Sequence, residues 1–105
     1  MRFKVTVSYD GREFHGWQIQ NDVRTVQEEI ERVITKITKK PTSIYGSGRT
    51  DSKVHAQGQV FHFDSNLNMT CENWYKALNA LCPNDIYIEE VTKVNDDFHA
   101  RFDAT

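Results

Sequence analysis

An amphipathic helical pattern between residues 25 and 41 constrains the fold of this chain more than any other feature. Thr25 and Glu28 have the spacing of a capping box, which marks the start of a helix. Pro41 ends the pattern. A helix with one apolar face must cover another apolar layer, so the rest of the chain has to supply that layer. The apolar positions on the single face are Val26, Ile30, Val33, Ile34 and Ile37.

Strand-like patterns lie on both sides of this helix. The first alternating segment ends at the turn signal Asp10-Gly11. In the last, the apolar phase shifts at Glu89-Glu90, which predicts a bulge or a strand end. A second helix is predicted between Thr70 and Pro83, with Trp74, Leu78 and Leu81 at helical spacing. The strand-like segments are residues 3–9, 42–45, 60–64 and 86–91.

The order strand, helix, strand, strand, helix, strand predicts an α+β fold of the ferredoxin-like βαββαβ type. In that arrangement both helices pack on one face of an antiparallel sheet. The chain has 105 residues, of which 38% are apolar and 27% charged, and this is ordinary for one domain. At this size roughly two-thirds of the unfolded surface can be buried. We therefore expect residues 1–105 to form a single domain without disulfides or metal.

Several classes of protein are excluded by composition and spacing. No apolar run approaches the roughly 20 residues of a membrane span, and Met1-Arg2-Phe3-Lys4 leads into a strand rather than a signal peptide. We expect a cytoplasmic location. Cys71 and Cys82 lie on the second predicted helix, about 16 Å apart along its axis, and cannot bridge each other. We expect both to be small buried or boundary residues.

The formal net charge of −2 conceals an asymmetry between the two halves. Residues 1–55 carry ten Lys and Arg against seven acids, whereas residues 56–105 carry three against eight. A polyanion is therefore expected to approach the first half. An alternative is that Lys36, Lys39 and Lys40 only favour a helix C-terminus.

The Gly46–Ala56 segment carries residues typical of a functional site. Gly46 and Gly48 let the backbone approach a ligand closely or take positive φ. Arg49, two residues before Asp51, can hold a phosphate or pair with the carboxylate and keep it ionised near neutral pH. An ionised aspartate is a nucleophile or a base. Taken alone, an aspartate after a threonine is most often a turn or cap residue.

Other functional interpretations of the same residues fail on spacing. A phosphate-binding loop of nucleotide hydrolases requires a Lys and then Ser or Thr after its second glycine, and here Arg49 follows. The histidines and the two cysteines lack the close pairs of a zinc site, so no metal is expected. No Ser-His-Asp arrangement can be assigned from the scattered histidines His15, His55, His62 and His99.

Gly48-Arg49-Thr50-Asp51, followed by Val54-His55-Ala56 and Gly58-Gln59-Val60, resembles the active-site motif of the tRNA pseudouridine synthase A (TruA) family. The resemblance covers almost the whole chain. Further matches in the family's order are Tyr9-Asp10-Gly11, Phe14, Gly16-Trp17-Gln18, Gln20, Thr25-Val26-Gln27, Leu78-Asn79, Pro83, Asp85-Ile86, Phe98-His99-Ala100-Arg101 and Asp103-Ala104.

The resemblance implies an enzyme that isomerises uridine to pseudouridine in the anticodon stem-loop of tRNA, at positions 38 to 40, with no cofactor and no metal. Asp51 would be the catalytic nucleophile. Arg49 would keep Asp51 charged and help hold the target nucleotide out of the stack. Thr50 and His55 belong to the same motif and are assigned to the substrate site. The family also implies a homodimer.

Some members of the expected site have equally good structural interpretations. Gln18 lies among aromatic residues that could contact unpaired bases, or could pin a long loop onto the core with Trp17 as the anchor, which we favour. Arg101 could position the RNA backbone or pair with a nearby aspartate. His62 could either support the site or simply form hydrogen bonds on the sheet. His55 is the better site candidate, because it belongs to the motif.

Two departures from the family pattern matter. Ser52-Lys53 stands where small residues, often glycine, are usual, and Lys53 adds a charge beside the nucleophile that could contact phosphate. The chain also stops at Thr105, before the point where the family continues with an arginine and two tyrosines. We therefore expect this to be the N-terminal domain of such an enzyme, lacking the C-terminal domain and inactive alone.

The alternative is a non-catalytic RNA-binding module of the RNA recognition motif type, which has the same element order. It would need Phe61 and Phe63 to face RNA, and the core would then lose their buried area. A metabolite-binding regulatory domain also fits the fold but leaves the Arg-Thr-Asp sequence unexplained.

Overall fold

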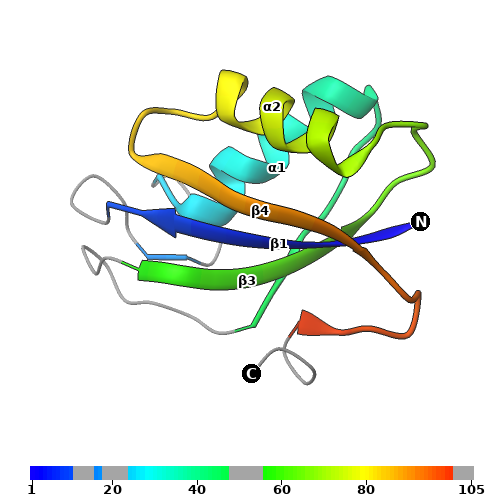
Figure 1. Ribbon diagram of the computed structural model, residues 1–105. Helices are drawn as coiled ribbons and strands as arrows, with labels where there is room; N and C mark the ends of the chain where they lie inside the picture. The colour runs from blue at the N-terminus through cyan, green and yellow to red at the C-terminus, as the bar shows by residue number, and fades with distance from the viewer. Residues whose placement is uncertain (11–15, 18–23, 48–55, 101–105) are drawn as a thin grey trace.

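The computed structural model describes residues 1–10, 16–17, 24–47 and 56–100, with the backbone alone for residues 56–58. The sheet has the strand order β2-β3-β1-β4, and each neighbouring pair is antiparallel. Both helices cover the same face of this sheet (Figure 1). The predicted α+β ferredoxin-like arrangement is confirmed. Its elements are β1 (Arg2–Tyr9), α1 (Val26–Thr38), β2 (Tyr45–Gly46), β3 (Ala56–Asp64), α2 (Cys71–Leu81) and β4 (Ile86–Val94).

Helix α1 begins where the capping pattern predicts. The Oγ1 atom of Thr25 accepts a hydrogen bond from the backbone N–H of Glu28 at 3.4 Å. At the other end, Lys39 adopts a left-handed conformation with φ 61°, and its N–H donates to the carbonyl of Thr35. The predicted apolar face is buried against the sheet, with Ile37 only partly buried.

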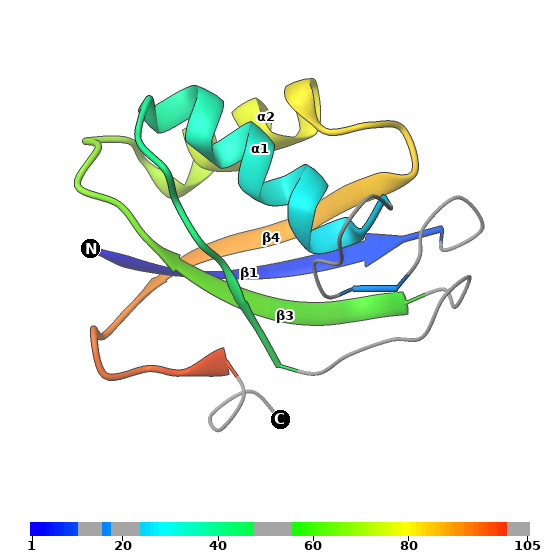
Figure 2. The ribbon, with the colours of Figure 1, turned by 180° about the vertical axis from the view of Figure 1, so that it is seen from behind.

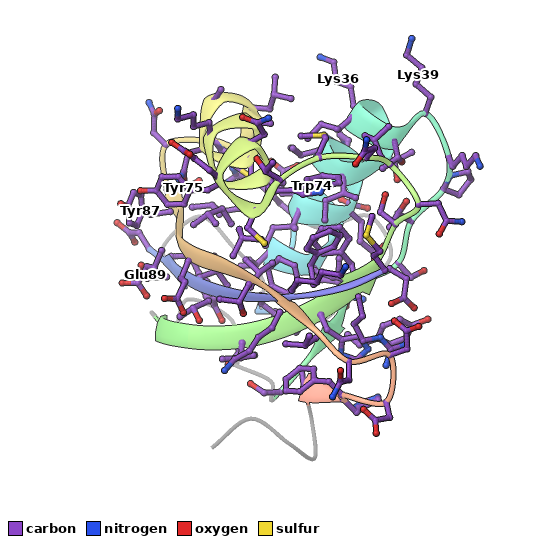
Figure 3. The ribbon with its side chains drawn as sticks, turned by 45° about the vertical axis from the view of Figure 1, so that its right-hand side comes forward. Lys36, Lys39, Trp74, Tyr75, Tyr87 and Glu89 are labelled. Atoms are coloured by element: carbon purple, nitrogen blue, oxygen red, sulfur yellow. The ribbon has the colours of Figure 1, made fainter. Side chains whose placement is uncertain are left out.

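Helix α2 begins after Thr70, whose Oγ1 atom accepts from the N–H of Asn73 at 3.1 Å. Trp74 and Leu78 are fully buried, and Figure 3 shows Trp74 between the helix layer and the sheet. The prediction that Leu81 shares this face was wrong, because its side chain is 43% exposed. The helix ends at Leu81. The buried side chain at this end is that of Cys82, whose backbone is extended. No helix among the described residues is long and apolar enough to span a membrane.

The strands alternate between a face that packs against the helices and an open face. In β1 every second residue from Phe3 to Tyr9 is buried. The register between β1 and β4 shifts between Thr6, which pairs with Glu90, and Val7, which pairs with Ile88. This shift confirms the predicted bulge, and it leaves Glu89 as the extra residue. Because of the bulge, Ile88 and Val91 are both buried although three positions separate them.

The aromatic residues of β3 belong to the core. Phe61 and Phe63 have no exposed surface, and the ring of Phe63 lies 5.4 Å from that of Phe3 and 5.0 Å from that of Trp74. The alternative of an RNA recognition motif required these two rings on the open face. They lie on the opposite one, because burying two phenylalanines against helices removes far more apolar area from water than burying Val60 would.

The chain after β4 turns back and crosses the open face of the sheet. Figures 1 and 2 show this return beneath the strands, on the side away from the helices. We call residues 95–100 the crossing segment. It is tied to the sheet at two backbone groups, the carbonyl of Phe98 and the N–H of Ala100. Ala100 is fully buried.

Candidate functional site

Most of the predicted site residues lie outside the described part of the chain. Gly46 is described, whereas Gln18, Gly48, Arg49, Thr50, Asp51, Lys53, His55 and Arg101 are not. The structure does describe the residues to which the Gly46–Ala56 segment is attached at both ends. That framework gives the two points of the sheet at which the segment begins and ends.

The Gly46–Ala56 segment leaves the sheet at its β2 edge. Gly46 pairs with Phe61 of β3, and the N–H of Ser47 donates to the carbonyl of Val60 at 2.7 Å. The segment returns at Ala56, where β3 begins opposite Tyr9, the last residue of β1. The residues around Asp51 therefore connect an edge strand to a central strand and have an anchor on each.

Gly46 has a packing role that is visible in the structure. A β-carbon at this position would lie 2.6 Å from Nε1 of Trp17 and 2.9 Å from its Cε2 atom. The indole of Trp17 is 97% buried and lies 6.0 Å from the rings of both Tyr9 and Phe61. The close approach that the glycine permits is thus to the protein's own tryptophan. Among the described glycines, positive φ is found at Gly16, at 90°.

Trp17 connects this edge of the sheet to the start of α1. Its carbonyl accepts from the N–H of Gln27 at 2.9 Å, and the carbonyl of Gly16 accepts from Val26 at 3.2 Å. These bonds satisfy helix N–H groups that have no partner inside the helix. The interpretation of Trp17 as an anchor onto the core is confirmed. Gln18, which follows it, lies outside the described residues.

An ion-pair network joins the helix layer to the same end of the sheet. Arg24 donates from Nη1 to Oδ2 of Asp85 at 2.9 Å and from Nη2 to Oδ1 at 3.2 Å, a two-pronged pair. Nη2 also lies 3.3 Å from Oε2 of Glu29. The hydrogen bond to Asp85 is the main cause of the raised pKa of Arg24. The backbone of Asp85 accepts from Asp10, so the network fixes the end of β1 and the start of β4 together.

His62 is a buried polar group on the open face. Its side chain is 1% exposed, and Nδ1 accepts the N–H of Ala100 at 3.0 Å. Burial is the main cause that lowers the pKa of His62 to about 4, and the nearby charge of Arg2 acts in the same direction. The imidazole is therefore neutral near pH 7 and can act as the acceptor. Its ring also stacks on Tyr45 of β2, with 5.1 Å between centroids.

The lysines at the end of α1 lie at the opposite end of the helix from Trp17 and the Arg24 network. Figure 3 shows Lys36 and Lys39 projecting away from the body of the molecule at the C-terminal end of the helix. Trp17 and the Arg24 network lie at its N-terminal end, and a helix of 13 residues is about 20 Å long. This placement at the C-terminal end is consistent with the interpretation that these lysines stabilise the helix C-terminus.

The two free cysteines differ in burial. Cys82 is buried, and its burial raises the pKa of the thiol to about 12. Cys71 is half-buried beside the core. Both match the expected small buried or boundary residues. Within the described residues no group of three His, Cys, Asp or Glu side chains is placed to hold a metal ion.

The sequence from β1 to the crossing segment matches one protein family. The family model described as tRNA pseudouridine synthase matches residues 5–103. The chain belongs to this family. The resemblance inferred from the motifs around Asp51 is therefore confirmed at the level of the family.

Individual relatives agree with the family match. A tRNA pseudouridine synthase A from Listeria monocytogenes serotype 4a (strain HCC23) is 54% identical over 102 residues, which are 96% of this chain and 41% of the relative. Its counterpart from Bacillus subtilis (strain 168) is 50% identical over 106 residues, covering 99% of this chain and 43% of the relative. The chain thus spans about two-fifths of the length of these relatives.

Sequence reasoning named His62 but missed its partner in the crossing segment, and it missed Arg2 altogether. The alternation in β3 indicates that His62 lies opposite Phe61 and Phe63, but no local pattern indicates that its partner is Ala100, 38 residues further on. Arg2 was likewise passed over, and it donates to the carbonyl of Phe98 from the other end of the chain. Contacts of this kind become visible only when the topology brings distant segments together.

Proposed function

We propose that the protein that contains this chain isomerises uridine to pseudouridine in the anticodon stem-loop of tRNA, with Asp51 as the nucleophile. One observation carries the proposal: the family match extends over residues 5–103 and includes the Gly48-Arg49-Thr50-Asp51 motif. The two anchored ends of the Gly46–Ala56 segment are consistent with this role, because a catalytic loop works best on a rigid scaffold.

The chemistry requires no redox partner. The bond between N1 of uracil and C1′ of the ribose breaks, the base turns, and a bond between C5 and C1′ forms. The proton lost from C5 is balanced by the one gained at N1, so no atom is added or removed. An ionised Asp51 can assist by adding to the sugar or the base, or by taking a proton from the sugar. Arg49 keeps the carboxylate charged and helps hold the nucleotide out of the stack.

The remaining assignments depend on the same proposal. Arg101 and Lys53 contact the RNA backbone, while Thr50, His55 and Gln18 contact the target nucleotide or its neighbours. A C-terminal domain completes the site in the full-length protein, which acts as a cytoplasmic homodimer. Residues 1–105 alone are then inactive. The relatives, which are more than twice as long as this chain, support this division.

The test is pseudouridine formation by the full-length protein on tRNA transcripts that carry or lack uridine at positions 38 to 40. We expect the wild type to modify the first set only and Asp51→Asn to be inactive while still folded and able to bind tRNA. Normal turnover by Asp51→Asn would rule out the nucleophile. An inactive wild type on every tRNA would rule out the proposed activity and favour an RNA-binding role.

A further inference from the structure

His62 contacts both β2, which leads into the Gly46–Ala56 segment, and the crossing segment, which leads into Arg101. Its ring stacks on Tyr45 of β2, the strand that leads into the Gly46–Ala56 segment. Its Nδ1 atom accepts from Ala100, the residue directly before Arg101. His99, in the same crossing segment, lies edge-on to the imidazole at 4.7 Å between centroids. One buried side chain thus contacts the residue before the Gly46–Ala56 segment and the residue before Arg101.

A second group holds the crossing segment against β1. Arg2 donates from Nη1 to the carbonyl of Phe98, while its Nε and Nη2 atoms bind the two oxygens of Asp64 at 2.8 and 2.9 Å. The two-pronged pair fixes the guanidinium plane, and its hydrogen bond is the main cause of the lowered pKa of Asp64. The ammonium of Lys4 lies 5.9 Å from the ring centroid of Phe98 on the same face.

The crossing segment is held by directional bonds and by one half-buried ring. Ala100 is fully buried, and its methyl group supplies little hydrophobic stabilisation. Phe98 is half-buried, and its ring lies edge-on to His62 at 6.1 Å between centroids. We expect loss of the bond to Phe98 or to Ala100 to let the segment shift while the helix-covered core remains packed.

We propose that His62 is a positioning residue for pseudouridine formation: it holds Ala100, the residue directly before Arg101, against the sheet beside Tyr45. The inference rests on the proposed function, since it assigns His62 a part in that reaction. A displacement of about 1 Å in a group that positions the substrate is enough to reduce turnover about 100-fold. His62 itself does not touch the substrate.

The experiment compares two replacements of His62 in the full-length protein. His62→Leu removes the acceptor, whereas His62→Asn keeps an oxygen close to the position of Nδ1. We expect kcat for pseudouridine formation to fall about 10-fold to 100-fold in His62→Leu, with a smaller change in KM, and to stay within about threefold of wild type in His62→Asn. Amide hydrogen exchange at Ala100 should become fast in His62→Leu and remain slow in His62→Asn.

Asn79→Ala is the matched control. Asn79 also binds backbone from a distant element, donating to the carbonyl of Ile88 at 3.0 Å and accepting its N–H at 2.9 Å, but on the helix-covered side. We expect it to lower stability and leave kcat of the folded enzyme unchanged. If the kcat of His62→Leu, calculated per folded enzyme molecule, also stays unchanged, His62 has only a structural role and the inference is wrong.

Ala100→Pro provides a second variant in case His62→Leu fails to fold. Proline removes the N–H donor while His62 and its stacking on Tyr45 remain. The same fall in kcat is expected, and normal kcat would contradict the inference.

The proposed function and the role of His62 would be contradicted by different results. Wild-type inactivity on every tRNA overturns the proposed function and this inference together, whereas an active wild type with unchanged kcat in His62→Leu and Ala100→Pro overturns this inference alone.

Discussion

The two faces of the sheet are held by different kinds of interaction, although the same strands build both. Phe61 and Phe63 point into an apolar layer beneath the helices, whereas His62 and Asp64, their immediate neighbours, bind polar groups on the open face. On the helix side, burial of apolar area supplies the stability. On the open side, a few directional bonds determine where the crossing segment lies. We therefore expect substitutions on the first face to change stability and those on the second to change position and activity.

The largest effect should come from breaking the helix-covered face. Phe63→Ala removes a fully buried ring that packs against Phe3 and Trp74. The lost burial and the remaining cavity should lower the free energy of unfolding by about 3 to 5 kcal/mol. The measurement is denaturant unfolding followed by circular dichroism. Val60→Ala, on the open face of the same strand, is the control and should cost less than about 1 kcal/mol.

If the two substitutions cost the same, stability would not be concentrated beneath the helices and the comparison between the faces would be wrong.

The open face should respond to acid through His62. The folded-state pKa of His62 is about 4, whereas an unfolded imidazole titrates near 6.5. The unfolded chain therefore binds the proton first, and the free energy of unfolding should fall by about 2 to 3 kcal/mol as the pH drops from 7 to 4.5. Asp64, whose pKa is lowered by its bonds to Arg2, remains charged in this range.

Urea unfolding at the two pH values isolates this contribution when wild type is compared with His62→Leu. The variant cannot take up the proton, so its stability should change less over the same range. Equal changes in the two proteins would mean that His62 titrates normally in the folded state, and that burial does not keep it neutral.

A smaller effect is expected where the two faces meet at the edge of the sheet. Gly46→Ala places a β-carbon where the indole of Trp17 now lies, and the buried ring has little room to move. We expect a loss of about 1 to 2 kcal/mol from overpacking. Thermal unfolding of Gly46→Ala, Trp17→Phe and the double variant measures the coupling.

Because phenylalanine frees the space, the double variant should be more stable than the sum of the single effects predicts. Additive effects would show that Gly46 is required for some other reason, such as the geometry of the segment that follows it.

Local patterns were sufficient for most of the fold. The capping residues Thr25 and Thr70, the alternation in β1 and the phase shift at Glu89-Glu90 each report on neighbours a few residues away. Such short-range patterns can be recognised in the sequence without knowledge of the tertiary structure. Leu81 was misplaced because helical periodicity alone does not indicate where the apolar face of α2 stops, and that point depends on how far the sheet extends beneath it.

The sequence by itself determined the element order, the family and the proposal that Asp51 is the nucleophile, because these depend on residue types at fixed spacings. The tertiary structure decided that Gly46 makes room for Trp17, and that His62 and Arg2 hold the crossing segment. Each of these contacts joins residues far apart in the chain. Their geometry arises only when β1, β3 and the crossing segment are packed together, so no local pattern could contain it.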